Sequence, residues 1–367
     1  MITPLTPSHL TGFMDLIEIC GFPRRSRAGW HWAFFENPEQ ELEPAGYALE
    51  TDGVLQGTIG THRRVLRNRD RRISLISAHT TVTRLSSPGS GIRLMRHTLN
   101  NYKGEGVFTL NNNALSAPVY PRIGVMPWRG EEGKLYLEKG LSWFELGVSK
   151  VFNSLSQTGL GNALRSRERL SSRLSPLTDT VQTSGLVMVN PFRRGDSEKL
   201  DRFSDAMQAG ENFEMTRTGE IWRYRLSDPD FKECQRIYAV EEAGEYTGLL
   251  AVSLCKESEL SASALEIEDL ARLETCSASR DDLLTAAKDI ACQVKVARVR
   301  WRILPTDFAS PENSDWMVRA KPYHFSHAQF RDEAVADHWT PGVGNGDFFF
   351  ATRRPPKFRR SSTNKTG

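Results

Sequence analysis

Each half of the chain opens with apolar residues spaced as on one face of an α-helix. The two segments are residues 8–17 and 198–207, where apolar side chains recur three and four positions apart. That period places them on one side of a helix and leaves the other side polar. Both segments are therefore predicted to be amphipathic helices that pack against a core.

Short apolar segments downstream of each helix predict β-hairpins. The strand pairs are residues 46–50 with 54–60 and residues 237–241 with 246–251. Asp52-Gly53 separates the first pair, and this dipeptide favours the tight turn of a two-residue loop. Gly244 lies in the turn of the second pair. Each half is thus expected to continue from its helix into two antiparallel strands.

These similarities belong to an internal repeat. Trp30 and Trp222 lie 192 residues apart, and Gly57 and Gly248 lie 191 residues apart. Because repeats at a fixed offset arise from repeated structural units, the chain is predicted to fold as two related lobes. Its 367 residues are also typical of two domains.

The first half continues as strand, glycine-containing turn and helix. Residues 73–83 are rich in β-branched side chains and predict a buried strand, whereas residues 92–99 carry an apolar helical face. Residues 106–110 predict a further strand. The second half repeats the strand and helix in 264–273 and 281–294, but the turn between them has no glycine. The expected fold class is α/β, an α+β mixed-sheet architecture in two tandem lobes, the second degenerate.

The expected domain organisation follows from these elements. Residues 1–130 form the first lobe and residues 186–352 the second. Residues 131–185 are interpreted as a helical connector, with a basic amphipathic helix on a membrane surface as the alternative. Residues 353–367 are expected to be a disordered basic tail from their composition.

Composition and charge exclude several classes of protein. Hydrophobic residues make up 39% of the chain and charged residues 25%, as in ordinary globular proteins. The net charge of +3 is too small to indicate a nucleic-acid-binding protein. Basic runs at 63–72 and 353–360 are interpreted as a solvated loop and tail, with contact to phosphates or a membrane surface as the alternative. No apolar run reaches the length of a membrane span.

The five cysteines bear on metal binding and on compartment. They are scattered, without a Cys-x-x-Cys pair or a paired Cys/His spacing. This distribution supports neither a disulfide framework nor a zinc site, so no metal is expected. A reducing cytoplasm fits best, because the N-terminal residues also lack the basic and apolar regions of a signal peptide.

The turn before the 92–99 helix is a candidate anion site. It contains Gly89 and Gly91. Unpaired N–H groups at a helix start and the helix dipole favour a phosphate at such a position. Arg93, in the first helical turn, has the charge and the reach to pair with that phosphate.

The segment after the 106–110 strand carries a family resemblance. It contains Asn113, Ser116, Val119, Tyr120, Arg122, Gly124 and Val125. Their order and spacing resemble the block Asn-x-x-Ala/Ser-x-x-aliphatic-Tyr-x-Lys/Arg-x-Gly-Phe/Val of the GNAT acyltransferases. The preceding turn resembles the family's pyrophosphate loop, Arg/Gln-x-x-Gly-x-Gly/Ala, in part. Gly91 is in place, whereas Pro88 and Arg93 depart from the pattern.

The resemblance implies an acyl-CoA site in the first of two GNAT-like lobes. A parallel strand pair would splay open, the pantetheine arm would lie there like an added strand, and backbone N–H groups near 82–85 would polarise the thioester carbonyl. The residues implied in coenzyme binding are Val82, Thr83, Leu85, Pro88, Gly89, Ser90, Gly91, Ile92, Arg93, Asn113 and Ser116. The second lobe is expected to bind no coenzyme.

The resemblance also implies direct attack of an amine on the thioester. Tyr120 is the candidate acid that protonates the departing thiolate, with a packed tyrosine as the alternative. His79 is a candidate base, since its ordinary pKa of about 6.5 suits that role, and Glu50 is another. Trp30 and Trp32 are expected to be packing elements, with a place along an acceptor channel as the alternative.

The predicted function is an acyl-CoA-dependent N-acyltransferase that uses acetyl-CoA or another acyl-CoA. Its acceptor would be a small-molecule amine held between the lobes, where residues 323–350 resemble closing strands that shape the cleft. No nucleic-acid partner is expected, and the oligomeric state stays open. Two alternatives remain: a GNAT-derived binding module without turnover, motivated by Pro88 and Arg93, and an aminoacyl-tRNA-dependent ligase.

Overall fold

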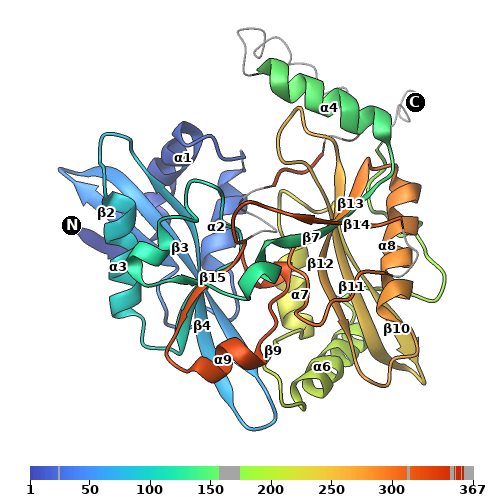
Figure 1. The fold of residues 1–367 in the computed structure, drawn as a ribbon. Helices are drawn as coiled ribbons and strands as arrows, with labels where there is room; N and C mark the ends of the chain where they lie inside the picture. The colour runs from blue at the N-terminus through green and yellow to red at the C-terminus, as the bar shows by residue number, and fades with distance from the viewer. Residues whose placement is uncertain are drawn as a thin grey trace, which may run out of the picture.

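Two mixed α/β lobes lie side by side in the computed structural model (Figure 1). The structure describes residues 1–23, 25–156, 174–311, 315–347, 351, 353–356 and 358. Each lobe is built on one twisted sheet with helices packed against it. The α/β fold class with two lobes is therefore confirmed.

The first sheet has the strand order β1-β2-β3-β4-β5-β15-β6, and β9 also pairs with β3. Its strands are β1 (Ile2–Pro4), β2 (Gly46–Thr51), β3 (Val54–Arg67), β4 (Arg72–Thr83), β5 (Gly106–Thr109), β15 (His327–Phe330), β6 (Met126–Pro127) and β9 (Glu214–Met215). The helices of this lobe are η1 (Pro7–His9), α1 (Leu10–Ile19), α2 (Arg27–Phe35), α3 (Ser90–Asn101), η2 (Tyr120–Ile123) and η3 (Gly130–Lys134). The predicted helix, hairpin, strand, helix and strand are all present in order.

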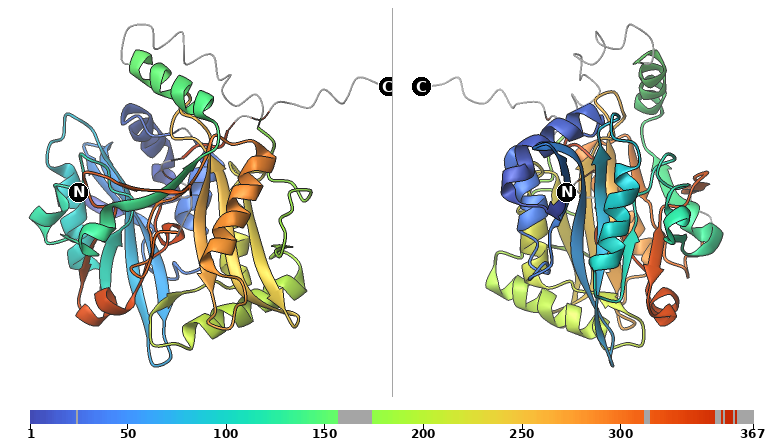
Figure 2. Two further views of the ribbon diagram at one scale, coloured as in Figure 1. Left: turned by 45° about the vertical axis from the view of Figure 1, so that its right-hand side comes forward. Right: turned by 90° about the vertical axis from the view of Figure 1, so that its left-hand side faces the viewer.

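The second sheet has the order β14-β7-β13-β12-β11-β10-β8. Its strands are β14 (Met317–Ala320), β7 (Leu135–Gly140), β13 (Arg298–Trp301), β12 (Ala264–Arg272), β11 (Glu245–Cys255), β10 (Gln235–Glu242) and β8 (Val187–Val189). The remaining helices are α4 (Trp143–Ser156), α6 (Arg194–Gln208), α7 (Gly219–Leu226), α8 (Arg280–Val294), α9 (Glu333–His338) and η5 (Val343–Asn345). Helix α4 stands away from both sheets (Figure 2). Within the described ranges, no helix has the length and apolar character needed to cross a membrane.

The two lobes exchange strands. β7 comes from the segment 131–185, expected to be a helical connector, yet it pairs with β13 and β14 of the second sheet. β15 comes from the 186–352 segment and pairs with β5 of the first sheet. Each exchanged strand covers a sheet edge that would otherwise expose unpaired N–H and C=O groups. The boundaries expected from the sequence therefore do not separate the two sheets, and residues 157–173 of the connector lie outside the described residues.

Because of this exchange, residues 1–130 expressed alone are expected not to fold stably. Phe108 on β5 would lose both β15 and the edge contact with Trp339, whose ring centroid lies 4.9 Å away. Exposing a buried aromatic side chain to water costs about 1.5–3 kcal/mol, a large share of the marginal stability of a domain. Circular dichroism should show a cooperative thermal transition for the whole chain and none for the fragment. A cooperative melt of the fragment would contradict this.

Equivalent residues of the two repeats contact each other at the interface between the lobes. Trp32 of α2 stacks on Tyr224 of α7 with ring centroids 4.8 Å apart, and Trp32 Nε1 donates to the Tyr224 carbonyl at 2.8 Å. These two residues occupy equivalent positions of the repeat. Trp30 and Trp32 are each 1% exposed, so they belong to the core and do not line a channel.

Only the second part of the basic run at 63–72, at the exposed turn between β3 and β4, is solvated as expected. β3 continues to Arg67, and alternate residues of a strand face opposite sides of the sheet. Arg64 therefore points inward, where it is 2% exposed and pairs with Glu39 at 3.4 Å. Arg353, expected to be part of a disordered tail, is likewise buried and pairs with Glu268 at 3.3 Å. Most of the remaining tail lies outside the described residues.

Candidate active site

A cavity opens where two parallel strands part. β4 and β5 are paired from Leu75 and Gly106 to Ser77 and Phe108. β4 then continues to Thr83, whereas β5 ends at Thr109. The residues that follow the last pair on each strand line one side of the cavity. The parting of a parallel strand pair, expected from the sequence, is thus a feature of the first lobe.

A β-bulge in β4 shapes the wall of this cavity. Thr58 of β3 faces Val82, but Gly60 faces His79, so β4 carries one more residue than β3 between these pairs. Thr80, in the bulge, has a φ of 41°, in the left-handed region that side chains other than glycine rarely adopt. Bulges redirect backbone groups that would otherwise pair within the sheet. Here the N–H of Thr80 donates to the carboxylate of Asp347.

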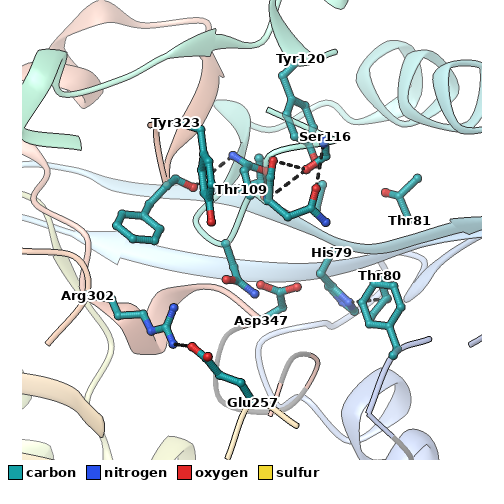
Figure 3. A pocket seen from close by; sticks show the side chains of 16 residues that line it. His79, Thr80, Thr81, Thr109, Ser116, Tyr120, Glu257, Arg302, Tyr323 and Asp347 are labelled. Atoms are coloured by element: carbon teal, nitrogen blue, oxygen red, sulfur yellow. Dashed lines mark hydrogen bonds and ion pairs between the residues drawn. The ribbon is translucent and has the colours of Figure 1, made fainter. Parts of the chain in front are cut away.

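Both lobes contribute to the cavity, which has a volume of about 230 Å³. Figure 3 shows its lining side chains converging from the β4 and β5 ends and from the second half of the chain. The lining residues are Phe22, Ala78, His79, Thr80, Thr81, Thr109, Asn111, Asn112, Asn113, Ser116, Tyr120, Glu257, Arg302, Tyr323, Phe325 and Asp347. Most of these residues carry polar groups, although apolar atoms make up about half of the lining surface. Among the described residues, no group of three or more His, Cys, Asp and Glu side chains could hold a metal ion.

Asp347 is a buried carboxylate with the properties of a base. It is 7% exposed, and burial raises its pKa to about 7. Hydrogen bonds from the Asn111 side chain and the Thr80 N–H, and the charge of Arg353, only partly offset that effect. A group with a pKa near the working pH can accept a proton during a reaction and release it afterwards. Asp347 is thus the carboxylate of this cavity best suited to proton transfer.

Tyr120, at the start of η2, also lines the cavity. Desolvation raises the pKa of Tyr120 to about 12, although hydrogen bonds with Thr109 and Ser116 act in the opposite direction. The phenol therefore stays protonated at neutral pH and can donate a proton. Its ring packs 5.2 Å from that of His327 on the exchanged strand β15. The geometry thus places the predicted acid in the cavity.

The other candidate bases lie in less suitable surroundings. Burial, and then the positive charge of Arg64, lower the pKa of His79 to about 3. Its Nδ1 lies 2.8 Å from Thr80 Oγ1, and its ring stacks on Phe34. This histidine lines the cavity but is too weak a base for proton abstraction near neutral pH. Glu50 lies outside the cavity lining and faces His9 at 3.7 Å.

Asn113 and Ser116 line the cavity and also shape the loop that carries Tyr120. Asn113 Oδ1 accepts hydrogen bonds from the N–H groups of Leu115 and Ser116, at 3.0 and 2.8 Å. The Ser116 hydroxyl in turn accepts from the Asn113 N–H at 3.2 Å. Short polar side chains that bond their own backbone stabilise tight turns. The spacing of the sequence motif therefore has a local structural cause.

The other residues implied in coenzyme binding form a continuous strip from β4 to α3, beside the cavity. Val82 and Ser90 are buried, Thr83 and Ile92 are half-buried, and Leu85, Pro88, Gly89 and Arg93 are exposed. Gly89 precedes α3 with a φ of 78°, and no side chain caps the first turn of this helix. Gly91 faces the methyl groups of Thr81 and Thr83. A Cβ placed on Gly91 would lie 3.6 Å from the first methyl carbon and 3.8 Å from the second. The helix start therefore presents backbone N–H groups beside β4.

The equivalent position in the second lobe has the opposite electrostatic character. Ser279 caps α8 in a capping box with Asp282, and Asp281 lies in the same first turn. Glu266 of β12 pairs with two arginines at the end of β13. One is Arg300, and the other is Arg302, whose Nη2 lies 3.4 Å from Glu266 Oε1. Carboxylates thus occupy the helix start where an anion would bind in the first lobe.

The chain resembles known proteins in its fold, whereas its sequence resembles them only weakly. No protein-family model and no curated protein matches the chain. A GCN5-related N-acetyltransferase from Anabaena variabilis superposes with a TM-score of 0.54 at 11% identity, over 90% of this chain and 73% of that protein. The chain has the GNAT fold.

Two further solved structures agree with this assignment. A GCN5-related N-acetyltransferase from Kribbella flavida gives a TM-score of 0.50 at 10% identity, over 90% of this chain and 71% of that one. A protein from Enterococcus faecalis, described as a probable N-acyltransferase, gives 0.52 at 11% identity, over 90% and 72%. The resemblance seen in the sequence is thus confirmed at the level of the GNAT fold.

Several lining residues of the second half have no local signal in the sequence. Glu257, Arg302 and Asp347 belong to no recognisable motif and reach the cavity only because the lobes pack together. Tyr323 and Phe325 lie in the 323–350 segment, which was expected to shape the cleft, and both line the cavity. Residues 348–350 of that segment lie outside the described residues.

Proposed function

We propose that the protein is an acyl-CoA-dependent N-acyltransferase, with acetyl-CoA as the first donor to test. The observation that carries this proposal is the meeting of three features in one cavity. Parallel strands part there, a tyrosine remains protonated, and a buried carboxylate has a pKa of about 7. The GNAT fold supports the same chemistry.

In this proposal the coenzyme lies along the strip from β4 to α3. Its pyrophosphate binds the N–H groups at the start of α3, with Gly89, Ser90, Gly91 and Ile92 forming the turn and Arg93 adding a positive charge. Pro88 precedes this turn. The pantetheine arm follows the backbone of Val82, Thr83 and Leu85 toward the place where β4 and β5 part. The thioester then reaches the cavity beside Asn113 and Ser116.

In the proposed reaction, Asp347 and Tyr120 each carry out one proton transfer. Asp347 accepts a proton from the acceptor amine, whose nitrogen lone pair attacks the thioester carbonyl and forms the new C–N bond. The C–S bond then breaks, and the Tyr120 hydroxyl protonates the departing thiolate. The small-molecule amine enters from the side of the second lobe, past Tyr323 and Phe325. No covalent enzyme intermediate is needed.

The proximity of an acid and a base favours turnover over a binding module. A module that only binds has no use for a carboxylate held at a costly raised pKa. The cavity volume of about 230 Å³ also favours a short acyl group over a long one. Acetyl transfer is therefore the first activity to test.

Gly91→Glu is expected to weaken acyl-CoA binding at least about 30-fold. The space around Gly91 accommodates a side chain without a clash, so the variant should fold, but the carboxylate would repel the coenzyme phosphates. Calorimetry with acetyl-CoA and longer acyl-CoA species measures the effect. Asn100→Glu adds the same charge at an exposed position of the same helix and serves as the matched control.

Each outcome of this titration decides between hypotheses. Binding to the wild type and the control, but not to Gly91→Glu, supports the proposed coenzyme site. Equal binding to all three proteins would place the coenzyme elsewhere. The absence of binding for every acyl-CoA would reject the acyltransferase proposal in favour of a non-catalytic module.

A further inference from the structure

Asp347 ends a short segment that both lobes hold. We name residues 342–347 the C-terminal strap. Arg64 of β3 donates from Nε to the carbonyl of Asn345 at 2.9 Å, and Arg225 of α7 donates from Nη2 to the carbonyl of Gly344. Both side chains are buried. One arginine from each lobe therefore holds the backbone immediately before the proposed base.

Further contacts leave the strap little room to move. Asn345 Oδ1 accepts from the Gly342 N–H at 2.6 Å, and Asn345 Nδ2 lies 2.9 Å from the sulfur of Met215. A Cβ at Gly344 would lie 2.4 Å from Arg225 Nη1, and one at Gly346 would lie 3.0 Å from Leu110 Cβ. The arginine heads and the strap backbone therefore fit closely. Movement of either arginine head would move the strap.

Arg64 and Arg225, the two arginines that hold the strap, are costly to bury together. Burial, and then the charge of Arg64, lower the pKa of Arg225 to about 10. Glu39 pairs with Arg64 at 3.4 Å, and Asp269 and Glu268 act on Arg225 in the opposite direction to Arg64. Apolar residues of similar size would pack such an interface with less desolvation cost, so net stability does not account for these two arginines.

We propose that Arg64 and Arg225 are positioning residues for acyl transfer, because they fix the strap and so hold the Asp347 carboxylate in the cavity. This inference rests on the proposed function, since it needs Asp347 to act as the base. Neither arginine is among the residues that line the cavity. They act through the backbone of Gly344 and Asn345.

Several charged or titratable groups face Asp347 and set its protonation. The positive charge of Arg353 acts on it from beyond the strap, and its own charge acts on Tyr120. Glu257, Arg302 and His79 line the same cavity. A variant that loosens the strap leaves these charged groups in place. Its main effect on Asp347 should therefore be a change in solvation and not a change in the charges around the carboxylate.

Arg225→Lys and Arg64→Lys test the proposal by a double-mutant cycle. Lysine keeps the charge but loses the planar fork that reaches the carbonyls. Each change is expected to lower kcat about 10- to 100-fold with KM for acetyl-CoA changed less than about twofold, because small misplacements of a catalytic group are costly. In an Asp347→Asn background, the same changes should cause almost no further loss.

Arg25→Lys is the matched control. Arg25 is also a buried arginine between the lobes, where it pairs with Asp228 at 2.6 Å. Its substitution should change kcat by the same factor in both backgrounds. Gly344→Ala provides a second variant that displaces the Arg225 head if the lysine variants fold poorly, and thermal unfolding identifies such failures.

A second measurement needs no turnover. Carbon-13 NMR of labelled aspartates, with Asp347→Asn to assign the signal, gives the pKa of Asp347 directly. The wild-type value is expected near the raised pKa of about 7 that burial causes. In Arg225→Lys or Gly344→Ala, water entering beside a loosened strap should lower that pKa by at least one unit toward the ordinary value of 3.8.

The two measurements separate the two proposals. A lowered Asp347 pKa with non-additive loss of kcat supports the positioning role. An unchanged Asp347 pKa, or losses that multiply with Asp347→Asn, would overturn it. If the wild type transfers no acyl group to any amine while the pKa still responds to the strap, the proposed function fails and the effect of the arginines on Asp347 stands.

Discussion

Asp347→Asn is expected to lower kcat by a factor of about 10² to 10⁴ and to leave the affinity for acetyl-CoA within about threefold of wild type. Loss of a positioned base typically costs a rate factor of this size. The coenzyme strip from β4 to α3 is not part of the strap, so binding should survive. Steady-state assays of thiol release and calorimetric titration measure the two quantities.

The pH dependence of kcat identifies the group responsible. The base must be unprotonated to act, and burial raises the pKa of Asp347 to about 7, so wild-type kcat should rise with pH and level off above about 8. Because the pKa of Tyr120 is raised by desolvation to about 12, no loss on the alkaline side is expected below pH 10. Residual activity of Asp347→Asn should lack the rise near pH 7. An unchanged rise would assign it to another group.

Unfolding experiments distinguish a chemical from a structural cause of the expected loss of activity in Asp347→Asn. Burial raises the pKa of Asp347 above its ordinary value of 3.8, so the folded state holds an extra proton between pH 3.8 and 7. That contribution to stability is fully present below pH 3.8 and is lost as pH rises through about 7. Asn cannot ionise, so Asp347→Asn should be more stable than wild type at pH 8 by about 2–4 kcal/mol. Urea titrations at pH 5.5 and 8 test the sign.

Tyr120→Phe is expected to lower kcat about 10²- to 10³-fold with acetyl-CoA binding retained. The variant removes the proton donor for the departing thiolate but keeps the ring that packs 5.2 Å from His327. Single-turnover assays and calorimetry with acetyl-CoA separate the chemical step from binding. A purely structural tyrosine would leave kcat nearly unchanged or lower it together with thermal stability.

Tyr102→Phe is the matched control for this prediction. Burial raises the pKa of Tyr102 to about 12, as for Tyr120, and its hydroxyl donates to Ser74 Oγ at 3.0 Å. It belongs to the same lobe but does not line the cavity. Removing its hydroxyl should lower stability by about 1 kcal/mol and change kcat less than threefold. Equal kcat losses in both variants would remove the case for Tyr120 as the acid.

Local patterns in the sequence predicted most elements of both lobes. The hairpin around Asp52-Gly53, the strand now seen as β4 and the helix seen as α3 each depend on residues close together in the chain. The motif from Asn113 to Tyr120 is equally local, because its spacing builds a turn from hydrogen bonds between near neighbours. Periodicity and turn chemistry carry such information within a few residues.

Other features had no local signal because they depend on contacts between distant residues. Arg64 appeared to belong to a solvated basic run, yet β3 carries it into the interface between lobes. Strand β7 joins the sheet of the second lobe, and strand β15 joins the sheet of the first lobe. No pattern within a short segment of the sequence predicts these pairings. Asp347 owes its raised pKa to burial beneath both lobes.

The sequence by itself therefore determined the two-lobed plan through its internal repeat, and many helices and strands through periodicity within single segments. The candidate tyrosine came from the resemblance of one motif to the GNAT acyltransferases. Only the tertiary structure decided which strands complete each sheet and which carboxylate meets that tyrosine. Asp347 and Thr80 lie far apart in the chain, and packing alone brings them within hydrogen-bond contact. Burial and the approach of distant groups are properties of the folded chain as a whole.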